Sequence, residues 1–104
     1  MDKEKFIYYK DVEKLLDRND FLKSSCRRGK NGRLTYTYRS IKYYSLVFSI
    51  AITKLDPQDI KSDKVVLGIK LNEKELNGWN DFIDALKNLK KLHNKEKAKL
   101  YVIV

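Results

Sequence analysis

Basic and tyrosine side chains are concentrated in residues 21–55, and they are the groups with which this chain could do chemistry. The stretch contains eight of the 23 Lys and Arg residues and no Asp or Glu, and the whole chain has a net charge of +9. Such a stretch predicts a polyanion-binding surface, because cations neutralise phosphates and aromatic rings stack on bases. The predicted phosphate ligands are Lys30, Arg33, Arg39 and Lys42, the predicted stacking rings are Tyr36, Tyr38 and Tyr43, and the second-rank contacts are Arg27, Arg28 and Lys70.

Side chains for catalysis or metal binding are scarce. The chain has one His, His93, and one Cys, Cys26, and it lacks the usual nucleophile, phosphate-loop, dinucleotide and zinc-protease motifs. We expect no enzyme activity, no metal and no cofactor, and we interpret His93 as a surface residue at a helix end. A Mg²⁺-dependent nuclease is the less favoured alternative, because Asp81 and Asp84 also fit a solvated helix face.

Composition predicts one domain inside a cell. A chain of 104 residues with 42% apolar residues has the size and composition of a single globular domain. No apolar run is long enough to span a membrane, the charged N-terminus does not resemble a signal peptide, and a single cysteine suits a reducing compartment. We therefore expect a cytoplasmic location, in the nucleoid or in the interior of a host cell, and no membrane partner.

The N-terminal half is expected to contain a helix, a basic loop and two strands. Asp11 as N-cap, with Val12, Leu15 and Leu16 on one face, predicts a helix over residues 12–22. The glycines and Asn-Gly of residues 24–32 predict a loop. Alternating residues predict strands over 33–39 and 43–53, joined at 40–42.

The C-terminal half is expected to contain a strand, a long helix and a final strand. Residues 64–71 alternate as a strand does, with a bulge or a close backbone contact at Gly68. Asn72 as N-cap, with Glu75 three residues later, predicts a helix over residues 72–92. Its late lysines complement the helix dipole, so we discount them as ligands. A connector at 93–98 and a β-prone ending at 99–104 follow.

The predicted fold is α+β: an antiparallel sheet of about four to five strands packed against one long C-terminal amphipathic helix, with a short N-terminal helix. Within one domain, 1–104, residues 1–28 form the N-terminal helix and basic loop, 29–92 the sheet and helix core, and 93–104 a strand or arm. Leu34, Tyr36 and Tyr38 share one face of their strand, and Arg33 and Arg39 share the other. Either face could be the exposed one.

Two short motifs resemble the PC4-like family of transcriptional coactivators. The first is the basic turn that leads into a strand, and the second is a strand ending that runs into a tryptophan-containing helix. The likeness covers residues 29–89. Its motif residues are Gly29, Lys30, Asn31, Gly32, Arg33, Leu34 and Thr35, then Gly68, Ile69, Lys70, Leu71 and Asn72, and then Leu76, Asn77, Gly78, Trp79 and Ile83.

This resemblance implies a curved sheet that holds single-stranded DNA and a homodimer formed through the helices. Leu76 takes the place of the family's tryptophan, with Trp79 one turn later, and Thr37 takes the place of a basic residue. Whirly and PUR-type domains share the order of strands followed by a helix. The implied interface residues are Trp79, Ile83 and Leu86, and the matching ligand positions are Lys30, Arg33, Thr35 and Lys70, with Arg39 as a shifted substitute.

Two classes of partner therefore remain open. The first is single-stranded DNA or RNA, bound without catalysis and with low sequence specificity. The second is an acidic protein surface, bound by a small basic inhibitor or adaptor of the kind that phages and other mobile elements encode, with residues 99–104 adding a strand to the partner's sheet.

Overall fold

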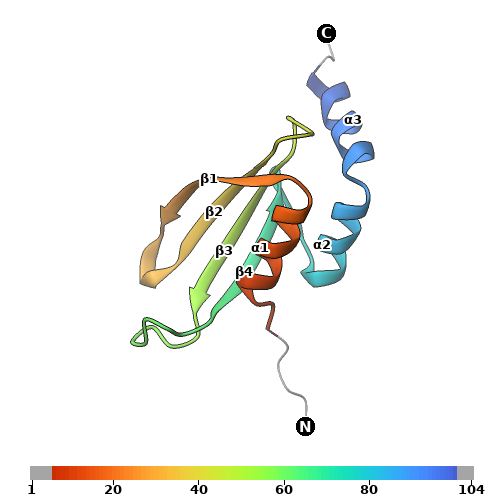
Figure 1. The fold of residues 1–104 in the computed structure, drawn as a ribbon. Coiled ribbons are helices and arrows are strands. Elements are labelled where there is room, and N and C mark those ends of the chain that lie inside the picture. Colours follow the sequence, from red (N-terminus) through yellow and green to blue (C-terminus); the bar gives the residue numbers. More distant parts are fainter. Residues whose placement is uncertain (1–5, 101–104) are drawn as a thin grey trace.

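A computed structural model describes residues 6–100 of the chain (Figure 1). A short helix precedes five consecutive strands, and two further helices end the described part. A 3₁₀ helix, Lys30–Gly32, lies within the turn between the first two strands. The elements are α1 (Tyr9–Arg18), β1 (Phe21–Arg28), β2 (Leu34–Ser40), β3 (Val47–Lys54), β4 (Lys64–Leu71), β5 (Lys74–Leu76), α2 (Gly78–Lys87) and α3 (Leu89–Leu100).

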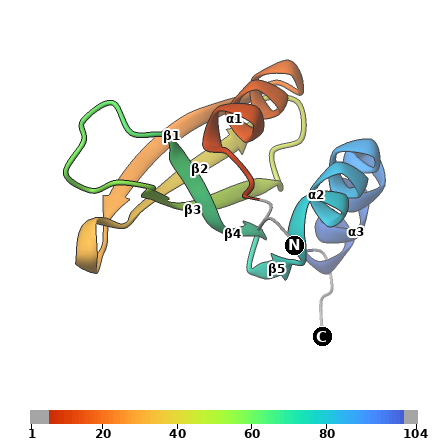
Figure 2. The same cartoon turned by 90° about the horizontal axis from the view of Figure 1, so that it is seen from below.

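The five strands form one antiparallel sheet in chain order, β1-β2-β3-β4-β5. Figure 2 shows α1 lying over this sheet, with α2 and α3 beside its β4–β5 edge. This arrangement confirms the predicted α+β class, the antiparallel sheet and the short N-terminal helix. The C-terminal helical region consists of two helices instead of the single predicted helix.

One face of the sheet carries the hydrophobic core. Tyr36, Ile50 and Ile69 lie opposite one another across β2, β3 and β4, and all three are buried. Both α1 and α2 pack on this face: the ring of Tyr9 stacks on Tyr36, and the ring of Phe82 meets Phe48 edge-on. The face of β2 that carries Tyr36 and the face of β3 that carries Ile50 therefore point inward, and the two helices take part in the same core.

Helix α1 begins earlier and ends earlier than predicted. Its N-cap is Tyr8, which makes no side-chain capping hydrogen bond, and Asp11 lies inside the first turn. The helix ends at Arg18 because Asp20 adopts a left-handed φ of 62°, which reverses the chain. Leu22, expected at the end of the helix, belongs to β1 instead.

The prediction of a loop over residues 24–32 is wrong for residues 24–28 and is confirmed for the turn that follows. Strand β1 runs as far as Arg28 along β2, and only the turn from Gly29 to Arg33 leaves the sheet. The seven residues of β1 after Phe21 are all exposed, so the strand lacks the buried alternation by which strands are recognised in a sequence. The backbone pairs with β2 regardless of the side chains that it carries.

The predicted strand over residues 43–53 begins too early. Strand β3 starts at Val47, and residues 41–46 form the connection from β2, closed by a hydrogen bond from the Leu46 N–H to the Tyr43 carbonyl. Leu46 is buried against the core, which explains why its neighbours appear to continue the apolar pattern of the strand.

The helix predicted from Asn72 begins six residues later. Asn72 has a φ of 56° and turns the chain from β4 into β5, and its side-chain oxygen accepts a hydrogen bond from the Val47 N–H at 3.0 Å. Gly78 has a φ of 78°, which no right-handed helix continues, so α2 can begin only there. Asn is common both in turns and at helix N-caps, so the pattern of Asn72 followed by Glu75 fits either structure. The bulge expected near Gly68 is present, because Ala51 faces Gly68 while Ile52 faces Val66.

Helix α2 ends at Lys87, with Asn88 as its C-cap, and α3 includes the predicted connector over residues 93–98. Lys99 and Leu100, expected to start a final strand, are the last residues of α3. The rest of that predicted strand, residues 101–104, lies outside the described residues. His93 is not a surface residue at the end of a helix: it is 8% exposed and lies within α3.

Candidate nucleic-acid interface

The face of the sheet opposite the core is the candidate interface, and we call it the open face. Alternation along each strand assigns its side chains, and strand register places them side by side. Thr37 lies opposite Ser49, which lies opposite Lys70. In β1 the alternation shifts between Lys23 and Ser25, which brings Leu22, Ser25 and Arg27 to the same face. The open face consists of Leu22, Ser25 and Arg27 from β1, Thr35, Thr37 and Arg39 from β2, Val47, Ser49, Ala51 and Thr53 from β3, Val65, Gly68 and Lys70 from β4, and Glu75 from β5.

Three cations stand on this face around a floor of small side chains. Arg27, Arg39 and Lys70 are exposed, whereas the serine, threonine and alanine side chains of β2 and β3 between them are half-buried. From the spacing between strands and the rise per residue, the Cα atom of Arg39 lies roughly 12–14 Å from the Cα atoms of Arg27 and Lys70. That separation exceeds the Debye length of about 8–10 Å, so the cations repel one another little and attract a polyanion together.

Few carboxylates lie close enough to these cations to neutralise their charge. The ion pairs formed among the described residues join Lys23 to Glu13 and Lys99 to Glu96, and neither pair includes a cation of the open face. Glu75 lies directly opposite Lys70 in the sheet register and offsets part of its charge. Arg27 and Arg39, on strands without an acidic residue, are therefore the stronger phosphate ligands.

The turn between β1 and β2 extends the basic surface beyond the end of the sheet. Arg28 ends β1, and Lys30 and Arg33 lie within or just after the turn, all three exposed. The Gly29 N–H donates to the Arg33 carbonyl at 2.8 Å, and the Arg33 N–H donates to the Lys30 carbonyl at 3.3 Å. The predicted ligands Lys30, Arg33, Arg27 and Arg28 thus gather at one end of the hairpin.

Tyr36 and Tyr38 do not lie on the basic surface. They are only 8% and 3% exposed, because their face of β2 is the core face. The Tyr36 ring stacks on Tyr9 with the ring centres 4.9 Å apart, and the Lys23 ammonium lies 4.3 Å from its centre. The Tyr38 hydroxyl shares a hydrogen bond with the Tyr9 hydroxyl. The interpretation of these tyrosines as base-stacking platforms requires exposed rings and is not supported by this placement.

Buried tyrosine hydroxyls make stability sensitive to high pH. Burial and the hydrogen bond with Tyr38 raise the pKa of Tyr9, and burial raises the pKa of Tyr38 despite the opposing effect of that bond. Above about pH 10 the unfolded chain loses these protons while the folded chain keeps them, so stability falls. We expect the urea midpoint to fall between pH 9 and pH 11, and to fall less when Tyr9 and Tyr38 are both replaced by Phe. An equal fall in both proteins would contradict this account.

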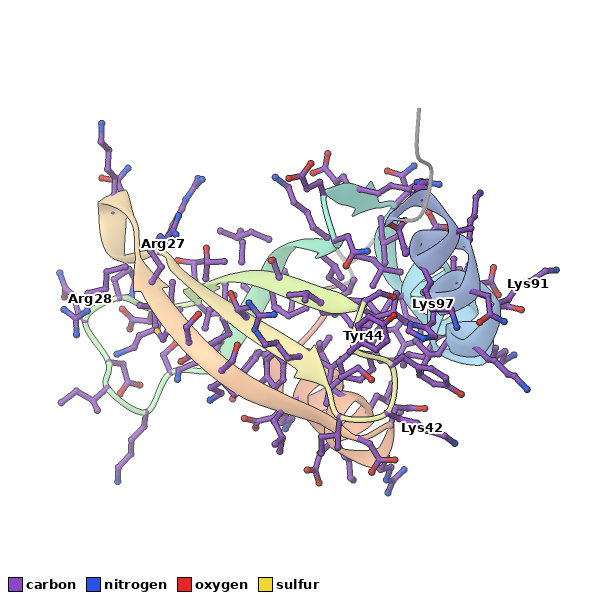
Figure 3. The ribbon with its side chains drawn as sticks, turned by 90° about the horizontal axis from the view of Figure 1, so that it is seen from above. Arg27, Arg28, Lys42, Tyr44, Lys91 and Lys97 are labelled. Carbon is purple, nitrogen blue, oxygen red and sulfur yellow. The ribbon has the colours of Figure 1, made fainter. Side chains whose placement is uncertain are left out.

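The connection between β2 and β3 forms an aromatic corner against α3. The Ser45 hydroxyl lies 2.7 Å from Nδ1 of His93, and the rings of Tyr43 and Tyr44 contact the His93 ring with centres 5.4 Å and 4.9 Å apart. Tyr43 is half-buried there, whereas Tyr44 is 61% exposed. Figure 3 shows Tyr44, Lys42 and Lys97 of α3 at the end of the sheet away from Arg27 and Arg28.

Sequence reasoning missed Tyr44 and the lysines of α3. The predicted strand over residues 43–53 included Tyr44, but Tyr44 belongs to a turn, and the polar Ser45 beside it was a possible signal. The lysines were discounted as complements to a helix end. Lys90 and Lys91 instead lie in the first turn of α3, where the dipole does not favour cations, so that structural explanation does not apply.

The predicted interface residues of α2 lie partly in the core of the same chain. Ile83 and Leu86 are half-buried and pack against that core. Trp79 is 37% exposed and contacts Phe82 with the ring centres 5.8 Å apart. The homodimer stays a prediction, with Trp79 as the residue of the three that has most surface to offer a partner.

Among residues 6–100 no three His, Cys, Asp or Glu side chains come together as metal ligands, and no helix is long and apolar enough to cross a membrane. Comparisons with protein-family models, curated proteins and solved structures return no significant match. The resemblance to the PC4-like family therefore stays a prediction. The open face, the turn between β1 and β2 and the aromatic corner are the features of the molecule that indicate a function.

Proposed function

We propose that this protein binds single-stranded nucleic acid without catalysis and with low sequence specificity. The observation that carries the proposal is the open face: one side of a five-stranded sheet that no described helix covers, bearing Arg27, Arg39 and Lys70 around a neutral floor. A polyanion that lies across this floor gains several phosphate contacts at once and releases its counterions. Lys30, Arg33 and Lys42 extend the positive charge to the two ends of the sheet.

Low specificity follows from the side chains of the floor. Threonine, serine and alanine offer hydroxyl and methyl groups that contact a base or sugar but distinguish bases poorly. Arginine and lysine bind the sugar-phosphate backbone, which is the same for every sequence. A single strand can follow the twist of the sheet because its backbone is flexible, and its exposed bases can stack on an aromatic ring.

Tyr44 is the ring that we assign to base stacking. It is 61% exposed and meets His93 edge-on, which holds it in place. Base–aromatic stacking contributes about 1–3 kcal/mol per base. We expect Tyr44→Ala to weaken binding of a single-stranded oligonucleotide on the order of tenfold, and Tyr44→Phe to preserve it, as measured by fluorescence anisotropy. Equal affinities for the Ala and Phe variants would exclude a stacking role.

Methyl groups on the two faces of the sheet provide a direct test of the proposed surface. Thr35, Thr37 and Ala51 carry methyl groups on the open face, whereas Ile50 and Ile69 carry theirs in the core. In methyl NMR spectra, titration with a short thymidine oligonucleotide is expected to shift the open-face signals and leave the two core signals nearly unchanged. Shifts confined to α1, or no shifts at all at physiological salt, would sink the proposal.

The edge strand β1 favours a second candidate, an acidic protein partner. Its outer edge pairs with no strand among residues 6–100, its last seven residues are exposed, and it carries Lys23, Arg27 and Arg28 with no carboxylate. An acidic extended segment could add to this edge as a further strand. A pull-down that retains one stoichiometric protein after nuclease treatment, while the purified protein fails to bind oligonucleotides, would favour this alternative.

A further inference from the structure

A concave site lies between the β1–β2 turn and the β3–β4 connection, and we call it the turn pocket. Figure 1 shows that the turn and the connection lie at the same end of the sheet. The pocket has a volume of about 350 Å³, enough for a phosphate group and part of a sugar. It is lined by Arg28, Gly29, Asn31, Gly32, Arg33, Leu34, Thr53, Lys54 and Pro57.

The charge of the turn pocket distinguishes it from other concavities of the described chain. Arg28, Arg33 and Lys54 line it with no carboxylate among the other residues, and none of the three belongs to an ion pair formed among residues 6–100. The other large concavities are lined by carboxylates as well as cations or by a carboxylate alone, for example Glu73 and Glu96 beside α3, or Asp11 beside Trp79. A concave site with three uncompensated cations attracts a multiply charged anion.

The backbone of the turn gives this anion access. Asn31 and Gly32 both have left-handed φ values, 60° and 72°, which fold the chain tightly. A Cβ built on Gly32 would have no neighbour within 4 Å, so the space beside it is open. The Thr53 hydroxyl is a further donor, and Leu34 and Pro57 provide an apolar wall for a sugar.

We propose that the turn pocket binds a terminal phosphate of a nucleic-acid strand that lies on the open face, an inference that rests on the proposed function. A terminal phosphate carries about −1.5 to −2 charges at pH 7 and three acceptor oxygens, which suit three cationic donors. An internal phosphodiester carries one negative charge, and the chain on both sides of it restricts its entry into a pocket. The turn pocket thus fixes the terminus of the nucleic acid at one end of β2. Tyr44 lies at the opposite end of β2.

The test compares four forms of one twelve-nucleotide DNA: 5′-phosphorylated, 3′-phosphorylated, with hydroxyls at both ends, and closed into a circle. We expect one phosphorylated form to bind about tenfold more tightly than the hydroxyl form in fluorescence anisotropy. The gain is expected to be smaller at pH 5 than at pH 7, because the second ionisation of a phosphomonoester has a pKa near 6. The circle is expected to bind like the hydroxyl form, since both offer only internal phosphates.

The double variant Arg28→Gln with Lys54→Gln is expected to lose this gain, so that it binds the phosphorylated and the hydroxyl forms with the same affinity. Lys10→Gln with Lys87→Gln makes the same change in net charge on α1 and α2 and should retain the gain. If the wild type binds all four DNAs equally, the turn pocket is not a terminal-phosphate site although the proposed function stands. If none of the four binds, the proposed function fails and this inference fails with it.

Discussion

Replacing Arg27 and Arg39 with glutamate is expected to weaken binding of a single-stranded oligonucleotide on the order of 100-fold at moderate salt. The two side chains stand on neighbouring strands of the open face, exposed and outside the ion pairs of the described chain. A hydrogen bond to a charged group contributes about 1.5–3 kcal/mol, and each 1.4 kcal/mol is a tenfold change in affinity. Reversing both charges also adds repulsion of the phosphates, so the loss should exceed that of the corresponding alanine variant.

The matched control for this pair is Lys10→Glu with Lys87→Glu. These lysines are exposed on α1 and α2, away from the open face, and their reversal changes the net charge by the same amount. Long-range electrostatics alone would make the two double variants equally weak. We expect the control to bind within about threefold of wild type at 150 mM salt, where distant charges are screened. Equal losses in both double variants would refute the assignment of the open face.

The second large effect is expected in the core. Phe48 is completely buried, and its ring meets Phe21 of β1 and Phe82 of α2 edge-on, with ring centres 5.0 Å and 5.5 Å apart. It therefore joins the edge strand, the central strand and a helix in one cluster. Phe48→Ala should lower the free energy of unfolding by about 3–5 kcal/mol, a large share of the 5–15 kcal/mol of a typical domain.

Urea unfolding measured by circular dichroism checks this value. Ile60→Ala provides the control, because Ile60 is 89% exposed in the β3–β4 connection and its truncation should change stability by less than about 0.5 kcal/mol. A loss under 1 kcal/mol for Phe48→Ala would mean that this ring does not join the three elements as described.

The strands with a buried face could be predicted from the sequence, and the edge strand could not. Residues in β2, β3 and β4 alternate between core and open face, so their periodicity shows the strand and which residues share a face. Strand β1 is exposed on both faces after Phe21, and its residues resemble a polar loop. Backbone pairing, which leaves no trace in the side chains, decides its conformation.

The C-terminal half shows how one residue pattern can serve two structures. Asn72 followed by Glu75 suits both a helix N-cap and a tight hairpin turn, and the register of Lys70 against Glu75 shows that the hairpin forms. The left-handed φ of Gly78 then prevents a helix from passing through it. The glycine inside the predicted helix was therefore the signal that the helix begins there.

The basic residues of the candidate site could be predicted from the sequence, but its aromatic residues could not. Alternation in β2 and β4 places Arg39 and Lys70 on the open face, whereas Arg27 joins them through the register of β1, which the sequence did not reveal. Tyr36 and Tyr38 lie on the opposite side, since the helices cover the tyrosine face, and a sequence does not state which face a helix covers. Tyr44 can be recognised as an exposed turn residue only when the start of β3 is known.

The measurement that tests the central claim most directly is a salt series of fluorescence anisotropy with a single-stranded oligonucleotide and its duplex. Each neutralised phosphate of a single strand contributes roughly −0.7 to the slope of log affinity against log salt, so three to five contacts predict a slope of about −2 to −3.5. We expect tighter binding of the single strand and residual binding at high salt from stacking on Tyr44. Equal binding of both forms that vanishes at high salt, or no binding at physiological salt, would contradict the account.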